Sequence, residues 1–162
     1  MKTLITCIIS ICILSTLNAQ TKVEISDFEI LNNTNWKGTL IYKDYTSGKE
    51  TTLKTTMSVF LIKNKVVTEI KFPGEPKANS KSTTKLKKNG TYYGNEKVIT
   101  NEILEDGTVK ITTFFVGKDN YKKARMYKTY TFNKTSFSIV KDVQYLGSDE
   151  KFTRNKQNYK RI

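Results

Sequence analysis

The chain has 162 residues, no histidine and a formal net charge of +13, from 28 basic and 15 acidic side chains. Its two cysteines, Cys7 and Cys12, both lie near the N-terminus. This composition excludes Ser-His-Asp triads, Cys-His pairs and His- or Cys-ligated metal or haem centres from the rest of the chain. We therefore expect no enzymatic activity, no cofactor and no metal site.

The first 19 residues predict a secretory signal peptide. Lys2 supplies the positive charge, an apolar run covers 4–17, and Ala19 is a small residue suited to cleavage. The run is shorter than the roughly 20 residues that a transmembrane helix needs, and no later run approaches that length. We expect an exported protein, periplasmic or extracellular, cleaved near Ala19, with a single domain over 20–162 and no transmembrane segment.

The basic charge allows two interpretations. It is typical of a solvated lysine-rich surface, and it also favours binding to an anionic envelope surface of lipid or polysaccharide. Specific nucleic-acid recognition relies on arginine, whose planar guanidinium binds in bidentate fashion. Only three of the 28 basic residues are arginines, namely Arg125, Arg154 and Arg161. We therefore expect no specific nucleic-acid partner.

A short helical turn is predicted at the mature N-terminus, where Ser26–Asp27 can cap one turn through Leu31. From Trp36 onward, apolar and β-branched residues alternate with polar ones, a period typical of half-buried strands. Turn signals such as Asn89–Gly90 separate the alternating runs. The expected strands are 36–45, 51–63, 65–73, 82–88, 91–94, 97–105, 108–117, 122–133, 136–146 and 151–160.

The short spacing of these runs predicts consecutive hairpins rather than strands joined by crossover helices. An open meander would expose two strand edges, and closure into a barrel removes them. We therefore predict an all-β fold, a single antiparallel up-and-down meander of 8–10 strands that closes into a barrel. A barrel of about eight strands is either filled by its own side chains or holds one small ligand.

The alternation also predicts which side chains point into the barrel. The inferred inward faces carry an apolar lining with a few hydroxyl groups, and Lys128 lies on the same face as Met126 and Tyr130. An inward lysine is costly unless it is paired, so Lys128 either meets a negative group or extends to a barrel end. The predicted ligand-binding residues are Tyr42, Met57, Phe72, Phe115, Lys128, Tyr130 and Arg154.

These expectations favour a non-enzymatic extracytoplasmic protein that binds a small apolar or amphipathic ligand in the barrel lumen. Two alternatives stay open: a basic module that binds anionic lipid or polysaccharide, and a filled barrel that serves as an interaction partner or inhibitor. A catalytic pair of carboxylates across two strands, such as Glu69 with Glu102, also needs coordinates to be judged.

The sequence resembles the calycin-like barrels, that is, the lipocalins and their bacterial relatives. The resemblance rests on Trp36 and Gly38 in the first strand and on the arginines Arg154 and Arg161 in the last. It implies that Trp36 packs under one of these arginines, by stacking and cation–π contact, and plugs one end of the barrel. In lipocalins the glycine precedes the tryptophan, whereas Trp-x-Gly is similar to the nitrobindin-like barrels. Those bind haem through a histidine that this chain lacks, so haem binding is not implied.

Overall fold

The computed structural model describes residues 21–162, and the predicted signal peptide lies outside this range. Two short 3-10 helices, η1 and η2, accompany ten strands in the described residues. Their bounds are η1 Ile25–Leu31, β1 Thr34–Lys43, β2 Glu50–Ile62, β3 Lys65–Lys71, η2 Pro76–Ala78, β4 Ser80–Lys87, β5 Tyr92–Tyr93, β6 Glu96–Ile103, β7 Val109–Asp119, β8 Lys122–Phe132, β9 Ser136–Tyr145 and β10 Lys151–Arg161.

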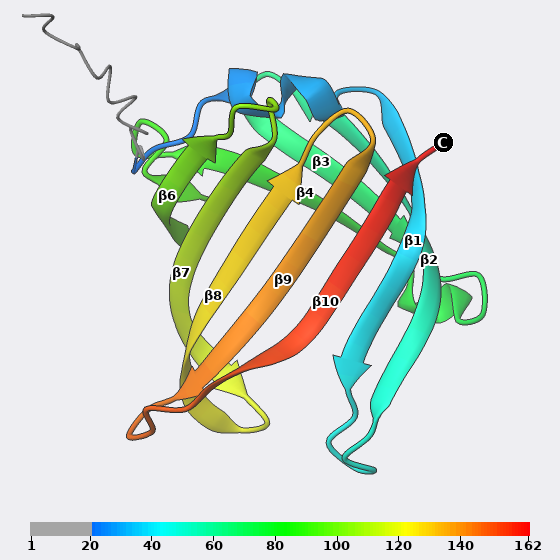
Figure 1. Ribbon diagram of the computed structural model, residues 1–162, viewed down its shortest axis with the longest axis vertical. Coiled ribbons are helices and arrows are strands. Elements are labelled where there is room, and N and C mark those ends of the chain that lie inside the picture. Colours follow the sequence, from blue (N-terminus) through cyan, green and yellow to red (C-terminus); the bar gives the residue numbers. More distant parts are fainter. Residues whose placement is uncertain (1–20) are drawn as a thin grey trace, which may run out of the picture.

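The strands form one closed antiparallel barrel in which each strand pairs with its neighbours in sequence and β1 pairs with β10 (Figure 1). This confirms the predicted all-β fold and its up-and-down order. The expected strand bounds lie within two residues of those observed. The bounds agree because alternation and turn residues mark each strand in the local sequence. The alternation also fixes the pairing register, since a one-residue slip would move every apolar side chain of a strand to the solvent face.

The helix η1 lies across one end of the barrel, at the top of Figure 1. Its N-cap is Glu24, two residues before the predicted cap at Ser26: the backbone N–H of Glu24 donates to Asp27 Oδ2 at 2.8 Å, so Asp27 acts from inside the first turn. Asn101 of β6 donates to the same carboxylate at 2.8 Å. The buried side chains of Phe28 and Leu31 then point into the barrel and close this end.

The main hydrophobic core fills the half of the barrel beneath η1. Phe28 stacks on Tyr93 and Phe132, with ring centroids 5.2 and 5.8 Å apart. Phe132 in turn contacts Phe137 in an edge geometry at 5.4 Å. A smaller cluster of Ala124, Met126 and Val143 packs farther along the β8–β9 wall. The barrel is therefore packed solid near η1 and less completely toward its other end.

Gly38 has a steric role in β1. A Cβ at this position would lie 1.9 Å from the carbonyl oxygen of Asn158 and 2.7 Å from the ring of Tyr159 on β10. Gly38 and Tyr159 are paired in the β1–β10 register. Glycine thus lets Tyr159 pack against the strand backbone, which gives the Trp-x-Gly motif a packing reason in this chain.

The barrel wall has one weakly paired section. β4 and β5 share only two residue pairs, and β5 itself is two residues long. On the side away from β3, residues 80–84 of β4 have no partner strand, and residues 115–119 of β7 extend past the last pair with β6. In this part of the described barrel, the facing edges of β4 and β7 are left open.

The burial of Trp36 gives a spectroscopic prediction. It is the only tryptophan of the chain and its side chain is fully buried beside Phe137. We expect blue-shifted emission from the folded protein, a red shift on unfolding in urea, and little quenching by iodide before unfolding. A native emission maximum equal to that in urea would contradict this position of Trp36.

Candidate functional site

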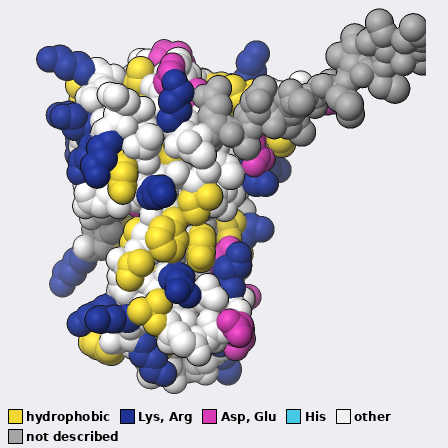
Figure 2. Space-filling model, turned by 90° about the vertical axis from the view of Figure 1, so that its left-hand side faces the viewer, with side chains coloured by type: hydrophobic (Ala, Val, Ile, Leu, Met, Phe, Trp, Pro, Cys, Tyr) yellow, Lys and Arg dark blue, Asp and Glu magenta, His cyan; other side chains and the backbone are white. Residues whose placement is uncertain are grey.

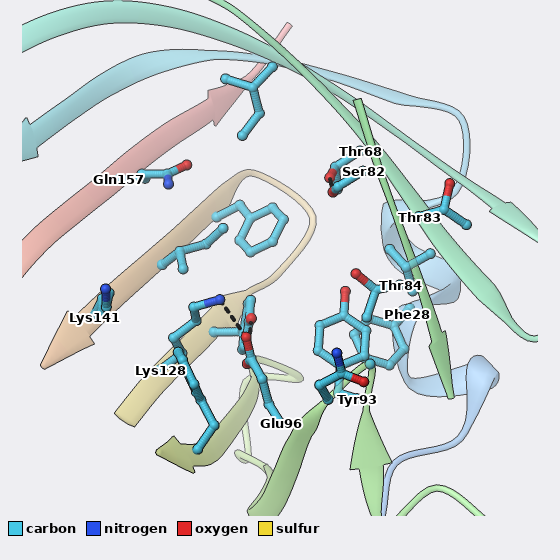
Figure 3. Close-up of a pocket in the computed structure, with 18 of the residues that line it drawn as sticks. Phe28, Thr68, Ser82, Thr83, Thr84, Tyr93, Glu96, Lys128, Lys141 and Gln157 are labelled. Atoms are coloured by element: carbon cyan, nitrogen blue, oxygen red, sulfur yellow. Dashed lines mark hydrogen bonds and ion pairs between the residues drawn. The ribbon is translucent and has the colours of Figure 1, made fainter. Parts of the chain in front are cut away.

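The barrel encloses a cavity of about 840 Å³ between the main core and the far end. Toward η1 it is lined by apolar side chains, including Phe28, Leu31 and Val66. Figure 3 shows Lys128 and Lys141 on one side of this cavity, with the hydroxyl-bearing side chains of β3 and β4 across from them. The polar lining residues are Thr68, Ser82, Thr83, Thr84, Asn95, Glu96, Lys128, Lys141, Asn155 and Gln157. The cavity is therefore apolar at its closed end and mixed elsewhere, where Phe115, Val116 and Ile139 lie among the polar side chains.

Glu96, the first residue of β6, is the centre of a hydrogen-bond network in the wall. Its carboxylate accepts hydrogen bonds from Thr113 Oγ1 at 2.6 Å and from the Tyr130 hydroxyl at 3.0 Å, and it pairs with the Lys128 ammonium. Burial raises the pKa of the Tyr130 phenol well above its usual value, and the Glu96 charge adds to this effect. Tyr130 is thus a neutral hydrogen-bond donor, and Glu96 has three donors from three different residues.

Lys128 can donate further hydrogen bonds in addition to its ion pair with Glu96. An ammonium group has three N–H donors. Its partner carboxylate is already shared with two hydroxyl groups. Lys128 Nζ also lies 5.4 Å from the centroid of the Phe115 ring. The lysine is therefore fixed in the lumen with donors available to a bound molecule.

A second carboxylate, the buried Asp119, organises the barrel end opposite η1. It accepts hydrogen bonds from the hydroxyls of Tyr45 and Tyr145, and lies 3.5 Å from Arg154 Nε and 3.9 Å from Lys141 Nζ. The Arg154 guanidinium lies 4.2 Å from the centroid of the Tyr45 ring. Burial, followed by the hydrogen bond to Asp119, raises the pKa of the Tyr45 phenol. These side chains tie β7, β9 and β10 to the turn that follows β1.

The cavity reaches the surface through the side of the barrel, between β4 and β7. Its lining includes Thr83, which is exposed, and Val116, whose side chain is 59% exposed. Gly94 and Asn95, in the turn between β5 and β6, border the same opening. The gap corresponds to the open edges of the two strands, so the weakly paired wall section forms a lateral entrance.

The outer surface beside this entrance is partly apolar. Ile99 and Val116 are exposed, and Phe114 packs on Tyr127 with ring centroids 5.3 Å apart. Figure 2 shows apolar side chains gathered in the middle of this side of the molecule, with Lys and Arg side chains around them. Acidic side chains lie between some of the basic ones, so the positive charge on this face is distributed rather than concentrated in one patch.

The seven predicted ligand-binding residues fall into three groups. Phe115, Lys128 and Tyr130 line the cavity. Met57 belongs to the main hydrophobic core, and Phe72 directly follows the last residue of β3. Tyr42 and Arg154 lie at the end opposite η1, where the guanidinium is 5.9 Å from the Tyr42 ring. The structure therefore brings the first three together, and the other four lie outside the cavity lining.

Trp36, the predicted plug of one barrel end, has other contacts than the sequence predicted. Arg154 lies at the end opposite Trp36 and donates to the backbone carbonyl of Lys43, so its proposed pairing with Trp36 is wrong. Arg161 is the register partner of Trp36 across β1 and β10, but its exposed guanidinium donates to the carbonyl of Lys134 at 3.4 Å. In place of an arginine, Phe137 contacts Trp36 with its ring at 5.9 Å.

The sequence reasoning missed Glu96 and Asp119, the two carboxylates that organise the lumen. The alternative pair of Glu69 and Glu102 is separated by β4 and β5 in the barrel. Glu69 pairs with Lys81 at 2.6 Å and Glu102 with Lys110 at 3.8 Å, so the two carboxylates do not form a site together.

Two further findings concern residues 21–162. This range contains no helix that is both long and apolar enough to span a membrane. Within the same range, no group of three or more acidic side chains is arranged to hold a metal ion.

No model of a known protein family matches this chain, and a search of curated proteins finds no similar sequence. The closed antiparallel barrel is compatible with the calycin-like resemblance. Membership of that family remains a prediction that rests on architecture and on the Trp36–Gly38 motif.

Proposed function

We propose that this protein is an exported, non-enzymatic binding protein that holds one small amphipathic ligand in its barrel lumen. The observation that carries this proposal is the cavity of about 840 Å³, which is apolar beneath η1 and polar around Lys128 and Lys141. Its volume falls in the range of about 300–1,000 Å³ that is typical of small-molecule sites. A ligand with an apolar body and a polar head matches both halves of the lining.

The lateral entrance supports the same function. The closed end beneath η1 and the Asp119 network leave the gap between β4 and β7 as a route into the lumen. The apolar side chains of Ile99 and Val116 beside it offer a surface along which an amphipathic molecule can approach. No catalytic role is needed for any residue in this arrangement, so binding accounts for the cavity.

Native mass spectrometry of protein purified from its own cell envelope tests this proposal. We expect a co-purifying small molecule with the wild-type chain, and its loss from Ile139→Trp, because the indole fills space that Ile139 borders. The matched control is Val140→Trp, since adjacent strand residues point to opposite faces of the sheet. This variant should retain the bound mass.

Circular dichroism should show that both variants keep the β-rich spectrum of the wild type. Equal bound mass in the two variants would contradict binding in the lumen. Binding in the lumen would also be contradicted if the wild-type protein is purified without ligand and binds neither dodecanol nor dodecanoic acid. The anionic-surface alternative stays a prediction from charge alone, and on the face shown in Figure 2 acidic side chains lie between some of the basic ones.

A further inference from the structure

The barrel register pairs two lysines directly inside the lumen. Lys128 of β8 is the Cα partner of Lys141 of β9, and both side chains line the cavity. They are partly buried, with side-chain exposures of 29% and 21%. Like charges directly opposite each other on neighbouring strands are destabilising. Such a pair therefore needs negative charge close by.

The carboxylates of the protein supply this negative charge unequally. Glu96 pairs with Lys128 and also accepts two hydroxyl groups. Asp119 is the nearest carboxylate to Lys141, but the 3.9 Å separation of Nζ and Oδ1 exceeds a hydrogen bond, and Asp119 is also bound by two tyrosines and by Arg154. Counting Arg154 at the adjoining barrel end, three cationic groups share two carboxylates in this described part of the barrel.

Lys141 is consequently the less well compensated of the two lysines. Burial lowers the pKa of its ammonium group, Asp119 opposes this effect, and the positive charges of Lys128 and Arg154 reinforce it. An anion near Lys141 Nζ would be favoured because it would supply the missing charge and the missing hydrogen-bond acceptor.

Neutral side chains with hydrogen-bond donors lie beside Lys141 on the neighbouring strand. Asn155 of β10 is the register partner of Lys141, and Gln157 lies one inward position further toward η1. Ile139 precedes Lys141 on the inward face of β9, and Phe137 precedes Ile139. The lysine pair thus lies where the polar lining meets the apolar lining.

We propose, on the basis of the proposed lumenal function, that the ligand is an amphipathic acid whose carboxylate binds between Lys128 and Lys141. Its apolar chain would extend past Ile139 toward Phe28 and Leu31. Hydrogen bonds to charged groups are roughly twice as strong as neutral ones, so the acid is preferred over an uncharged amphiphile of equal length.

Calorimetric titration of ligand-free protein with dodecanoic acid and with dodecanol, below their aggregation concentrations, tests this inference. We expect the wild-type protein to bind the acid about tenfold or more tightly than the alcohol. Lys141→Met should abolish this preference and change alcohol affinity little. Lys141 is chosen because replacing Lys128 would leave the Glu96 carboxylate without its cation.

The matched control is Lys156→Met, which removes an exposed lysine of β10 and should keep the full preference for the acid. Thermal melts should show that Lys141→Met is at least as stable as the wild type, since it removes one of two opposed charges. Equal binding of acid and alcohol, or a preference unchanged in Lys141→Met, would overturn the anion site alone. Binding of neither probe would instead overturn the proposed lumenal function.

Discussion

Replacing Glu96 by alanine should lower the free energy of unfolding by about 3 kcal/mol or more, because it leaves a partly buried ammonium group without its counter-charge. The same change removes the acceptor of the Tyr130 hydroxyl, which is 9% exposed, and leaves the fully buried Thr113 hydroxyl with only the Lys128 carbonyl at 3.5 Å. A buried donor without a partner adds its own desolvation cost. Urea unfolding followed by Trp36 fluorescence measures the effect.

The control for this prediction is Glu69→Ala, which removes the carboxylate of an exposed ion pair with Lys81 and should change stability little. The double variant Glu96→Gln with Lys128→Met should be more stable than Glu96→Ala, because it removes both charges instead of one. If Glu96→Ala and Glu69→Ala were equally stable, the Glu96 network would not hold the wall of the cavity.

Strand positions were readable from sequence because each strand carries its own local signal. In β7, Val109, Ile111, Thr113 and Phe115 alternate with outward residues, and the turn at Asp106–Gly107 marks where the strand begins. Such patterns depend only on neighbours in the chain. Closure of the barrel then followed from the cost of exposed edges, which does not require knowledge of any particular contact.

The lumen was harder to predict because its contacts join residues far apart in the sequence. Glu96 is 32 residues from Lys128, and Asp119 is 74 residues from Tyr45. In a chain with 28 basic residues, a single carboxylate resembles ordinary surface charge. The sequence carried one signal for an inward Glu96, namely its place in the strand alternation. Glu96 lies two residues before the buried Val98, on the same face of β6.

The predicted pairing of Arg154 with Trp36 fails because the antiparallel register places Arg161 opposite Trp36, and a local irregularity then sets where Arg154 points. The β9–β10 register shifts between Thr153 and Asn155, so the simple alternation of β10 is interrupted at Arg154. Its guanidinium reaches the Asp119 network at the barrel end opposite Trp36. A bulge adds one residue to a strand and redirects the neighbouring side chains, and no turn residue marks it in the sequence.

Trp36 should have the largest effect among the core residues. We expect Trp36→Ala to lower the free energy of unfolding by about 3–5 kcal/mol, because it removes a fully buried ring and leaves a cavity. The indole Nε1–H donates to Thr34 Oγ1 at 2.7 Å, and that hydroxyl donates to the Leu31 carbonyl at 2.6 Å. Trp36 therefore anchors η1 to β1 as well as filling the core.

A second variant separates these two contributions. Thr34→Val keeps the volume of the side chain but leaves the buried indole N–H without an acceptor, which should cost about 1–3 kcal/mol. It should also speed amide hydrogen exchange in η1, because the link from β1 to the Leu31 carbonyl is lost. Tyr121→Ala is the control, since this aromatic ring is 95% exposed and its removal should leave urea unfolding, followed by circular dichroism, unchanged. Unchanged exchange in η1 of Thr34→Val, with a normal loss of stability in Trp36→Ala, would show that the ring alone holds the helix across the barrel end.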